Sequence, residues 1–165
     1  MPKYAAFLRG IGPSNPNMRQ EKLKSFFESL GFANVRAVIS SGNVIFESRS
    51  KNIPDLEQKI EKALPKKLGF NSMTIVVSEE QLKKLVKQNP FKGLNHKTDS
   101  YLLVTFFKNK PTKQLKYDRA VCNVFNLSGN RGPEIMVGLE KQYGKQITSR
   151  TWKTISKIVS LFAAT

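Results

Sequence analysis

The sequence contains a single cysteine, Cys122, and a single histidine, His96. One cysteine excludes an intramolecular disulfide and a zinc site built from several cysteines. One histidine excludes a metal site built from several histidines and leaves little basis for a histidine-centred catalytic triad. We find no paired carboxylates and no cofactor motif. We therefore predict no cofactor and no metal, identify no catalytic residues, and leave open whether the protein is an enzyme.

Long hydrophobic runs are also missing. No segment approaches the roughly 18 apolar residues that a membrane span needs. We therefore expect that the chain is not an integral membrane protein. The N-terminal residues lead straight into a strand-like segment, and we expect no secretory leader. With 165 residues, of which 39% are hydrophobic and 24% charged, the composition is that of a soluble globular protein with one domain or two small subdomains.

Acidic residues are scarce, and their shortage is uneven. The chain has 28 lysine and arginine residues against 12 aspartate and glutamate residues, a net charge of +16. Residues 1–80 have a net charge of +4, whereas residues 81–165 hold 16 basic and 4 acidic residues, a net charge of +12. A basic half of this kind favours nucleic acid or another polyanion as a partner. A solvated surface that keeps the protein dispersed is the alternative interpretation.

The first half of the chain predicts strands and helices in the order βαββαβ. We expect strands at 4–8, 35–39, 44–47 and 73–77, and helices at about 17–30 and from Asn52 to about Pro65. Asn17 and Asn52 are the expected N-caps. The order is that of a ferredoxin-like α+β unit, in which the helices cover one face of an antiparallel sheet.

The expected strands of this unit are apolar on both sides, which predicts a sheet with both faces covered. An RNA-recognition motif has the same order of elements, but it needs aromatic side chains on an exposed sheet face. The corresponding segment, 42–47, offers only Phe46. We therefore assign Phe46 to the core and place any nucleic-acid contact on loops and helix faces.

The second half predicts a smaller α+β subdomain. We expect a helix from Ser78 to Asn89, a strand at 101–107, a hairpin of two strands at 121–127 and 134–139, and a final helix at about 149–162. Residues 108–120 fit either a loop or a short helix. We expect subdomain boundaries at 1–78 and 79–165, with the two parts sharing a core.

The second half contains three basic clusters, at 83–92, at 108–116 and on the final helix. On the final helix, Arg150, Lys153 and Lys157 are spaced to form one stripe, opposite an apolar stripe that includes Trp152. The candidate polyanion-binding residues are Lys83, Lys84, Lys87, Lys108, Lys110, Lys113, Arg150, Lys153 and Lys157. A core-docked helix with a solvated basic side would also explain the stripe, and we expect Trp152 to be a core anchor.

The segment Arg9-Gly10-Ile11-Gly12 lies between a strand and a helix. Glycines in this position let backbone N–H groups approach an anion. The spacing matches neither a dinucleotide-binding nor a phosphate-binding loop, because Pro13 follows directly. A structural turn is the more common outcome of such a pattern.

Several segments taken in order resemble the uncharacterised bacterial family called domain of unknown function 1697. The segments that carry the resemblance are 4–11, 30–32, 41–46, 89–91 and 150–154, with Met18 and Leu23 between them. The family pattern more often has Asn-Val-Gly-Gly where this chain has 12–15, and Asn where this chain has Lys153. If those positions line a ligand site, this chain has an altered one.

The resemblance implies a cytoplasmic bacterial protein with ferredoxin-like α+β subdomains and no established activity, substrate or cofactor. Its recurring polar positions correspond to Arg9, Asn43 and Arg150, which are candidate ligand-binding residues. Two hypotheses follow. The first is noncatalytic binding of a polyanion, nucleic acid above all, by the basic clusters. The second is an enzyme or sensor for a small anionic metabolite, bound by Arg9, Asn43 and Arg150 at the interface between the subdomains.

Overall fold

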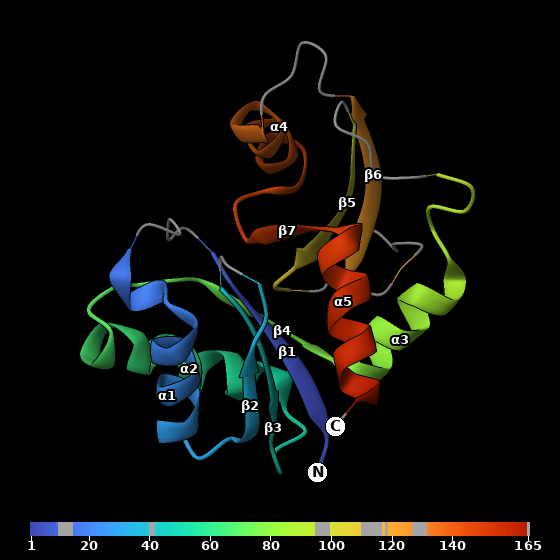
Figure 1. Cartoon of the computed structure of the whole chain (residues 1–165). Coiled ribbons are helices and arrows are strands. Elements are labelled where there is room, and N and C mark those ends of the chain that lie inside the picture. Colours follow the sequence, from blue (N-terminus) through green and yellow to red (C-terminus); the bar gives the residue numbers. More distant parts are fainter. Residues whose placement is uncertain are drawn as a thin grey trace. The chain divides into compact units, whose positions relative to one another are not determined.

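The computed structural model describes residues 1–9, 15–39, 42–94, 100–109, 117, 119–126 and 132–164. It divides into two compact units (Figure 1). The first consists of Met1–Glu80 and Ser160–Thr165, and the second of Gln81–Val159. The predicted boundary lay two residues earlier, and the predicted second subdomain also included residues 160–165.

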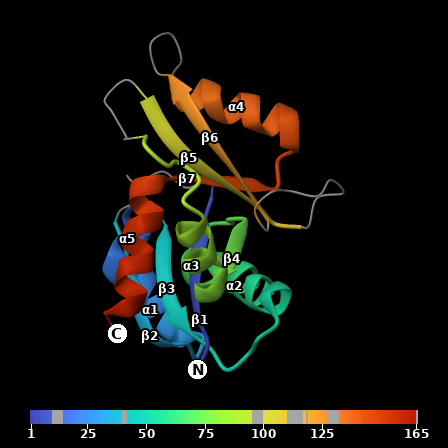
Figure 2. The same ribbon diagram turned by 90° about the vertical axis from the view of Figure 1, so that its right-hand side faces the viewer.

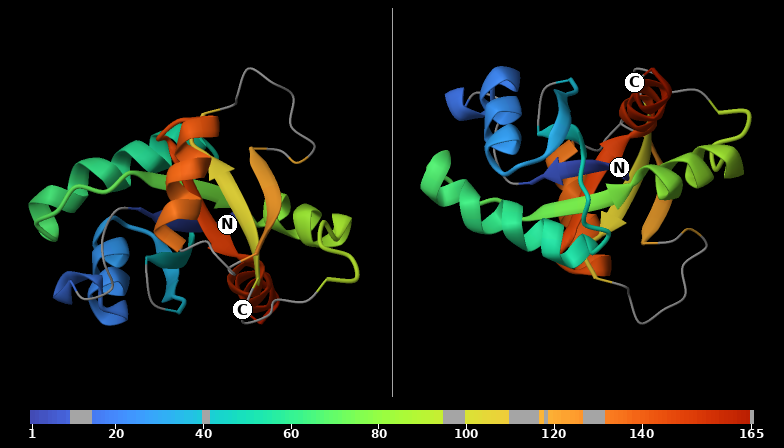
Figure 3. Two further views of the ribbon diagram at one scale, coloured as in Figure 1. Left: turned by 90° about the horizontal axis from the view of Figure 1, so that it is seen from above. Right: turned by 90° about the horizontal axis from the view of Figure 1, so that it is seen from below.

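The first unit is a four-stranded antiparallel sheet with two long helices on one face (Figures 1 and 3). Its elements are β1 (Lys3–Leu8), the 3-10 helix η1 (Pro16–Met18), α1 (Gln20–Ser29), β2 (Ala33–Ala37), β3 (Asn43–Glu47), α2 (Ile53–Lys67) and β4 (Thr74–Ser78). The strand order β2-β3-β1-β4 is that of the ferredoxin-like fold, so the predicted fold class is confirmed.

Both faces of the sheet are buried at β1, β3 and β4, as the apolar strands predicted, whereas Asn34 and Arg36 of the edge strand β2 are exposed. On the helix-covered face, Tyr4, Ala6 and Leu8 of β1 belong to the core that the helices complete. On the other face, Ala5 and Phe7 are buried just as completely. Since alternate residues of a strand point to opposite faces, burial of five consecutive residues requires cover on both sides.

Helix α2 begins where the sequence predicted, because the Asn52 Oδ1 atom accepts a hydrogen bond of 3.1 Å from the Asp55 N–H. The helix continues past Pro65 to Lys67. The N-terminus of α1 differs from the prediction. Asn15, not Asn17, caps the 3-10 turn, and α1 starts only at Gln20. The side chain of Asn17 is thereby free to make contacts elsewhere in the unit.

Two glutamates of α2 cover the outer edge of β4. Glu57, which is 3% exposed, accepts a hydrogen bond of 3.0 Å from the Val76 N–H. One helical turn later, Glu61 accepts one of 3.3 Å from the Thr74 N–H. The unpaired N–H groups of an edge strand can pair with a strand of another chain. These carboxylates accept hydrogen bonds from two such groups of β4.

Replacing Glu57 by alanine is expected to lower the free energy of unfolding by about 1–3 kcal/mol, because the buried Val76 N–H loses its acceptor. Glu57→Gln keeps an acceptor oxygen and should cost clearly less. Urea denaturation of both variants measures the difference. Equal losses would contradict the assignment of this carboxylate as the acceptor for the edge strand.

The second unit is a three-stranded antiparallel sheet with the order β6-β5-β7. Its elements are α3 (Glu79–Gln88, whose first two residues belong to the first unit), β5 (Ser100–Phe107), β6 (Ala120–Asn126), α4 (Gly132–Tyr143), β7 (Ile147–Thr151) and α5 (Trp152–Ala163, which ends in the first unit). Helix α4 lies along one face of the sheet (Figure 2), where Ile135 and Leu139 pack with Phe107 and Ile147.

Two predictions for this half were wrong. The segment 134–139, predicted as a strand, is part of α4, and β6 pairs with β5 instead. Burial of Ile135 and Leu139, four residues apart, with Val137 64% exposed between them, is the pattern of a helix. The final helix starts at Trp152 rather than 149, because residues 147–151 form β7. Thr151 is the cap, and its Oγ1 atom accepts from the Thr154 N–H at 3.3 Å.

Candidate functional site

The lysines of α3 lie on the exposed side of an amphipathic helix. Leu82 and Leu85 are buried, whereas Lys83, Lys84 and Lys87 are exposed. Glu79 and Glu80 in the first turn precede Lys83 and Lys84 by four residues, a spacing that favours helix ion pairs. Lys87, in the last turn, has no acidic residue within four positions on either side.

Helix α5 repeats this arrangement without any acidic residues. Ile155 and Ile158 are buried, and Lys153 and Lys157 are exposed one turn apart on the other side. Two lysines at this spacing repel each other, which costs an isolated helix about 0.2–0.5 kcal/mol. Residues 141–165 hold five basic residues and no acidic residue, so α5 itself supplies no carboxylate to offset the repulsion.

Trp152 connects the two lysine-bearing helices of the second unit. Its ring meets that of Phe91, just beyond α3, edge to face with centroids 5.3 Å apart. Phe91 is buried and Trp152 is half-buried. The tryptophan thus packs against the protein, as expected for a core anchor, and α3 and α5 lie near each other (Figures 1 and 2).

Arg150 lies in β7, so the predicted helical stripe of Arg150, Lys153 and Lys157 is wrong in its first member. Its Nη1 atom donates to Thr148 Oγ1 at 2.8 Å and to the Ser149 carbonyl at 2.9 Å. Burial lowers the pKa of the guanidinium to about 10, because the charged form loses hydration. Arg150 therefore keeps its positive charge at neutral pH but is not part of the exposed lysine surface.

Arg9 and Asn43 lie at one end of the first unit's sheet. Asn43 of β3 pairs with Phe7 of β1, two residues before Arg9. Ser72 holds the backbone of Arg9 on both sides: its Oγ atom accepts from the Arg9 N–H at 2.9 Å and donates to the Arg9 carbonyl at 2.6 Å. Burial lowers the pKa of the Arg9 side chain.

Asn43 has a structural task that the sequence did not reveal. It is 2% exposed, and its Nδ2 atom donates to the Val38 carbonyl at 3.2 Å. The Val38 N–H in turn donates to the Asn43 carbonyl at 2.8 Å. These bonds close the connection between β2 and β3. Of the three candidate ligand-binding residues, Arg9 and Asn43 thus share one unit, and Arg150 belongs to the other.

Other candidate residues are placed differently. Lys108 is half-buried just after β5. Lys110 and Lys113 lie outside the described residues, as do residues 10–14 with the glycines after Arg9. In the part of the chain that the structure describes, no group of three or more histidine, cysteine or acidic side chains could hold a metal ion. Every described helix is too short or too polar to cross a bilayer.

Comparison with known proteins agrees with the predicted resemblance. A conserved bacterial protein of Streptococcus pneumoniae, SP0830, has a structure that matches with a TM-score of 0.71 and 19% sequence identity, over 99% of both chains. At this identity the match shows a shared fold. No curated protein matches the chain. The model of the family described as protein of unknown function (DUF1697) matches residues 1–121, and the chain therefore belongs to that family.

Proposed function

We propose that this protein is a noncatalytic polyanion-binding module that contacts the phosphates of nucleic acid through the exposed lysines of α3 and α5. The observation that carries the proposal is the pair Lys153 and Lys157, which lie exposed on one helix face within 25 residues that contain no acid. Lys84 and Lys87 on the neighbouring helix extend the same positive charge. Phosphates would relieve the repulsion among these ammonium groups.

Contact of this kind is independent of base sequence. Lysines on helix faces neutralise phosphates and release counterions, so the affinity falls steeply with salt. Four phosphate contacts predict a slope of about −4 in a plot of log affinity against log salt concentration. Between about 50 and 200 mM salt the affinity should therefore fall roughly 100-fold or more.

Fluorescence anisotropy with a labelled DNA duplex and a labelled RNA of the same length tests the proposal across such a salt series. Lys153→Glu/Lys157→Glu should weaken binding about tenfold or more and make the slope shallower by about 2, and Lys84→Glu/Lys87→Glu should act alike. The control is Lys51→Glu/Lys62→Glu, which changes the net charge equally at exposed positions of the first unit.

The control pair should have a much smaller effect at about 150 mM salt, where charges more than about 8 Å from a phosphate are screened. No binding of either nucleic acid at about 50 mM salt would refute the proposal. If the control pair lost as much affinity, net charge alone would explain the binding, and the proposed contact by α3 and α5 would be wrong. Circular dichroism of each variant shows whether the fold is retained.

The alternative, a small anionic metabolite bound by Arg9, Asn43 and Arg150, stays a prediction. Asn43 already uses its amide to hold the Val38 carbonyl. The Arg150 guanidinium donates to the neutral oxygens of Thr148 and Ser149. The lysines of α3 and α5 are exposed on helix faces, and we therefore place the polyanion first.

A further inference from the structure

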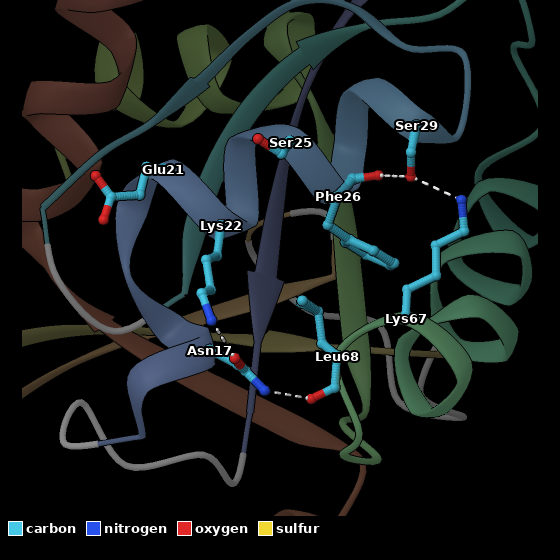
Figure 4. Close-up of a pocket in the computed structure, with 8 residues that line it drawn as sticks. All are labelled: Asn17, Glu21, Lys22, Ser25, Phe26, Ser29, Lys67 and Leu68. Atoms are coloured by element: carbon cyan, nitrogen blue, oxygen red, sulfur yellow. Dashed lines mark hydrogen bonds between the residues drawn. The ribbon is translucent and has the colours of Figure 1, made fainter.

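A pocket of about 470 Å³ lies in the first unit between α1 and the end of α2 (Figure 4). Neither its residues nor their chemistry enters the proposed nucleic-acid contact, which uses the second unit. Phe26, which is 3% exposed, and the half-buried Leu68 form the apolar middle of the pocket. Lys22 lies on one side of them and Lys67 on the other (Figure 4).

Both lysines are held in place by neutral oxygens. Lys22 Nζ donates to Asn17 Oδ1 at 2.9 Å, and Asn17 Nδ2 donates to the Leu68 carbonyl at 2.8 Å. Lys67 Nζ donates to Ser29 Oγ at 2.8 Å, and Ser29 Oγ donates to the Phe26 carbonyl at 2.6 Å. Each ammonium group is thus fixed by a side chain that is itself fixed to the backbone.

The charges of these two ammonium groups are not neutralised by carboxylates among the described residues. Lys24 lies on α1, like Lys22, but outside the pocket. It differs from the two pocket lysines, because its Nζ atom lies 3.1 Å from Glu28 Oε1. An ammonium group has three N–H donors. With one donor used on a neutral oxygen, Lys67 retains capacity and charge for an anion.

The bonds of these residues have a structural value as well. The Asn17 bond connects η1 to the end of α2, and the Lys67 bond connects α1 to it. Lys67 in the last turn of α2 also interacts favourably with the helix dipole. These roles explain why the side chains are ordered. They do not explain why two positive charges border an apolar hollow.

Glu21 decides which side of the pocket suits an anion. Its carboxylate lies on the side of Lys22, away from Lys67 and Ser29 (Figure 4). Negative charge in a ligand is therefore disfavoured beside Lys22 and favoured beside Lys67, whose ammonium group has N–H donors besides the one it gives to Ser29. The apolar body of such a ligand would cover Phe26 and Leu68.

We propose that this pocket binds a small organic oxyanion, a carboxylate or a phosphate ester, whose anionic group lies at the Lys67 ammonium group and whose apolar body packs on Phe26 and Leu68. Charge and apolar surface both contribute, so neither half of the ligand is sufficient by itself. A pocket of about 470 Å³ is in the size range of small-molecule sites.

The probes are phenyl phosphate and benzoate, which carry both features, together with inorganic phosphate and benzyl alcohol, which carry one each. They are titrated into the ¹⁵N-labelled full-length protein, and amide chemical shifts are followed. The amides of residues 22–29 and 66–69 should shift with phenyl phosphate or benzoate. Inorganic phosphate and benzyl alcohol should bind at least several-fold more weakly, because each lacks one set of contacts.

Lys67→Met should weaken the tighter of the two aromatic anions about tenfold, the value expected for loss of one charge-assisted hydrogen bond. Lys24→Met removes the same charge from α1 outside the pocket and should leave the affinity unchanged. Both positions are exposed, so the fold should tolerate both changes. Absence of shifts at these amides with either aromatic anion, or equal effects of the two substitutions, would overturn the proposal. Benzyl alcohol binding as tightly as the anions would do the same.

Discussion

Replacing Phe46 by alanine is expected to lower the free energy of unfolding by about 3–5 kcal/mol, the usual loss for a fully buried phenylalanine. Phe46 of β3 is 0% exposed. Its ring lies 4.4 Å from that of Phe32, 5.5 Å from that of Phe27 and 5.6 Å from that of Tyr4, measured between centroids. Alanine removes all three ring contacts and leaves a cavity between the sheet and its helices. Urea denaturation measures the loss.

Phe46→Leu is the matched variant, because it keeps much of the apolar volume and loses only the ring geometry. Its loss should be clearly smaller, about 1–2 kcal/mol. A loss below about 1 kcal/mol for Phe46→Ala would contradict the position of Phe46 at the centre of the core. If Phe46→Leu abolished nucleic-acid binding in a folded protein, the assignment of this ring to the core instead of to base stacking would be wrong.

Replacing Gly42 by alanine is expected to cost about 2–4 kcal/mol, from left-handed backbone strain and from crowding together. The φ angle of Gly42 is +77°, and an added Cβ atom would lie 2.9 Å from Leu8 Cβ and 3.1 Å from Met18 Cε. The Leu8 side chain cannot withdraw easily, because its backbone N–H is bonded to the Gly42 carbonyl at 2.9 Å. Thermal and urea denaturation measure the change.

Gly31→Ala provides the control for backbone strain alone. Gly31 has a φ angle of +89°, but no heavy atom beyond its own residue and its two chain neighbours lies within 4 Å of the position that a Cβ atom would take. Gly31→Ala should therefore lower the free energy of unfolding by about 1–2 kcal/mol. The excess loss at Gly42 measures how closely β1 approaches the connection between β2 and β3. Equal losses at the two glycines would show that crowding contributes nothing.

The first unit could be predicted from sequence because its signals are local. Apolar residues at helical spacing predicted α1 and α2, and Asn52 as an N-cap predicted the start of α2. Strand pairing then followed from the order of elements, which admits few arrangements. The start of α1 was misplaced, because Asn17 lies inside the 3-10 helix that Asn15 caps, and α1 begins only after Arg19, whose side chain makes no cap hydrogen bond.

The second unit was predicted less well because its local signals are ambiguous. The apolar residues of 134–139 are compatible with a strand, and burial against the sheet made them a helix. Pro133, at the second position of that helix, was the available signal for its start. The strand β7 is rich in serine and threonine, and its pairing with β5 could not be inferred from its own residues.

The candidate sites show the same division between local and long-range information. Lys153 and Lys157 were predicted as a stripe because helical spacing alone brings them together. Asn43 looked like a ligand-binding residue, although its amide bonds a carbonyl five residues away. Lys22 and Lys67 were not singled out, because α1 and α2 bring together residues that are 45 positions apart.

Helix α5 has a consequence for how the protein is made. Its first eight residues belong to the second unit, and its last residues return to the first, where Lys3 Nζ bonds the Phe162 carbonyl at 3.1 Å. During translation β1 emerges early from the ribosome. Residues 160–165, which complete the first unit, emerge only after the whole second unit has been synthesised. All residues of the first unit are therefore present only after the second unit has been synthesised.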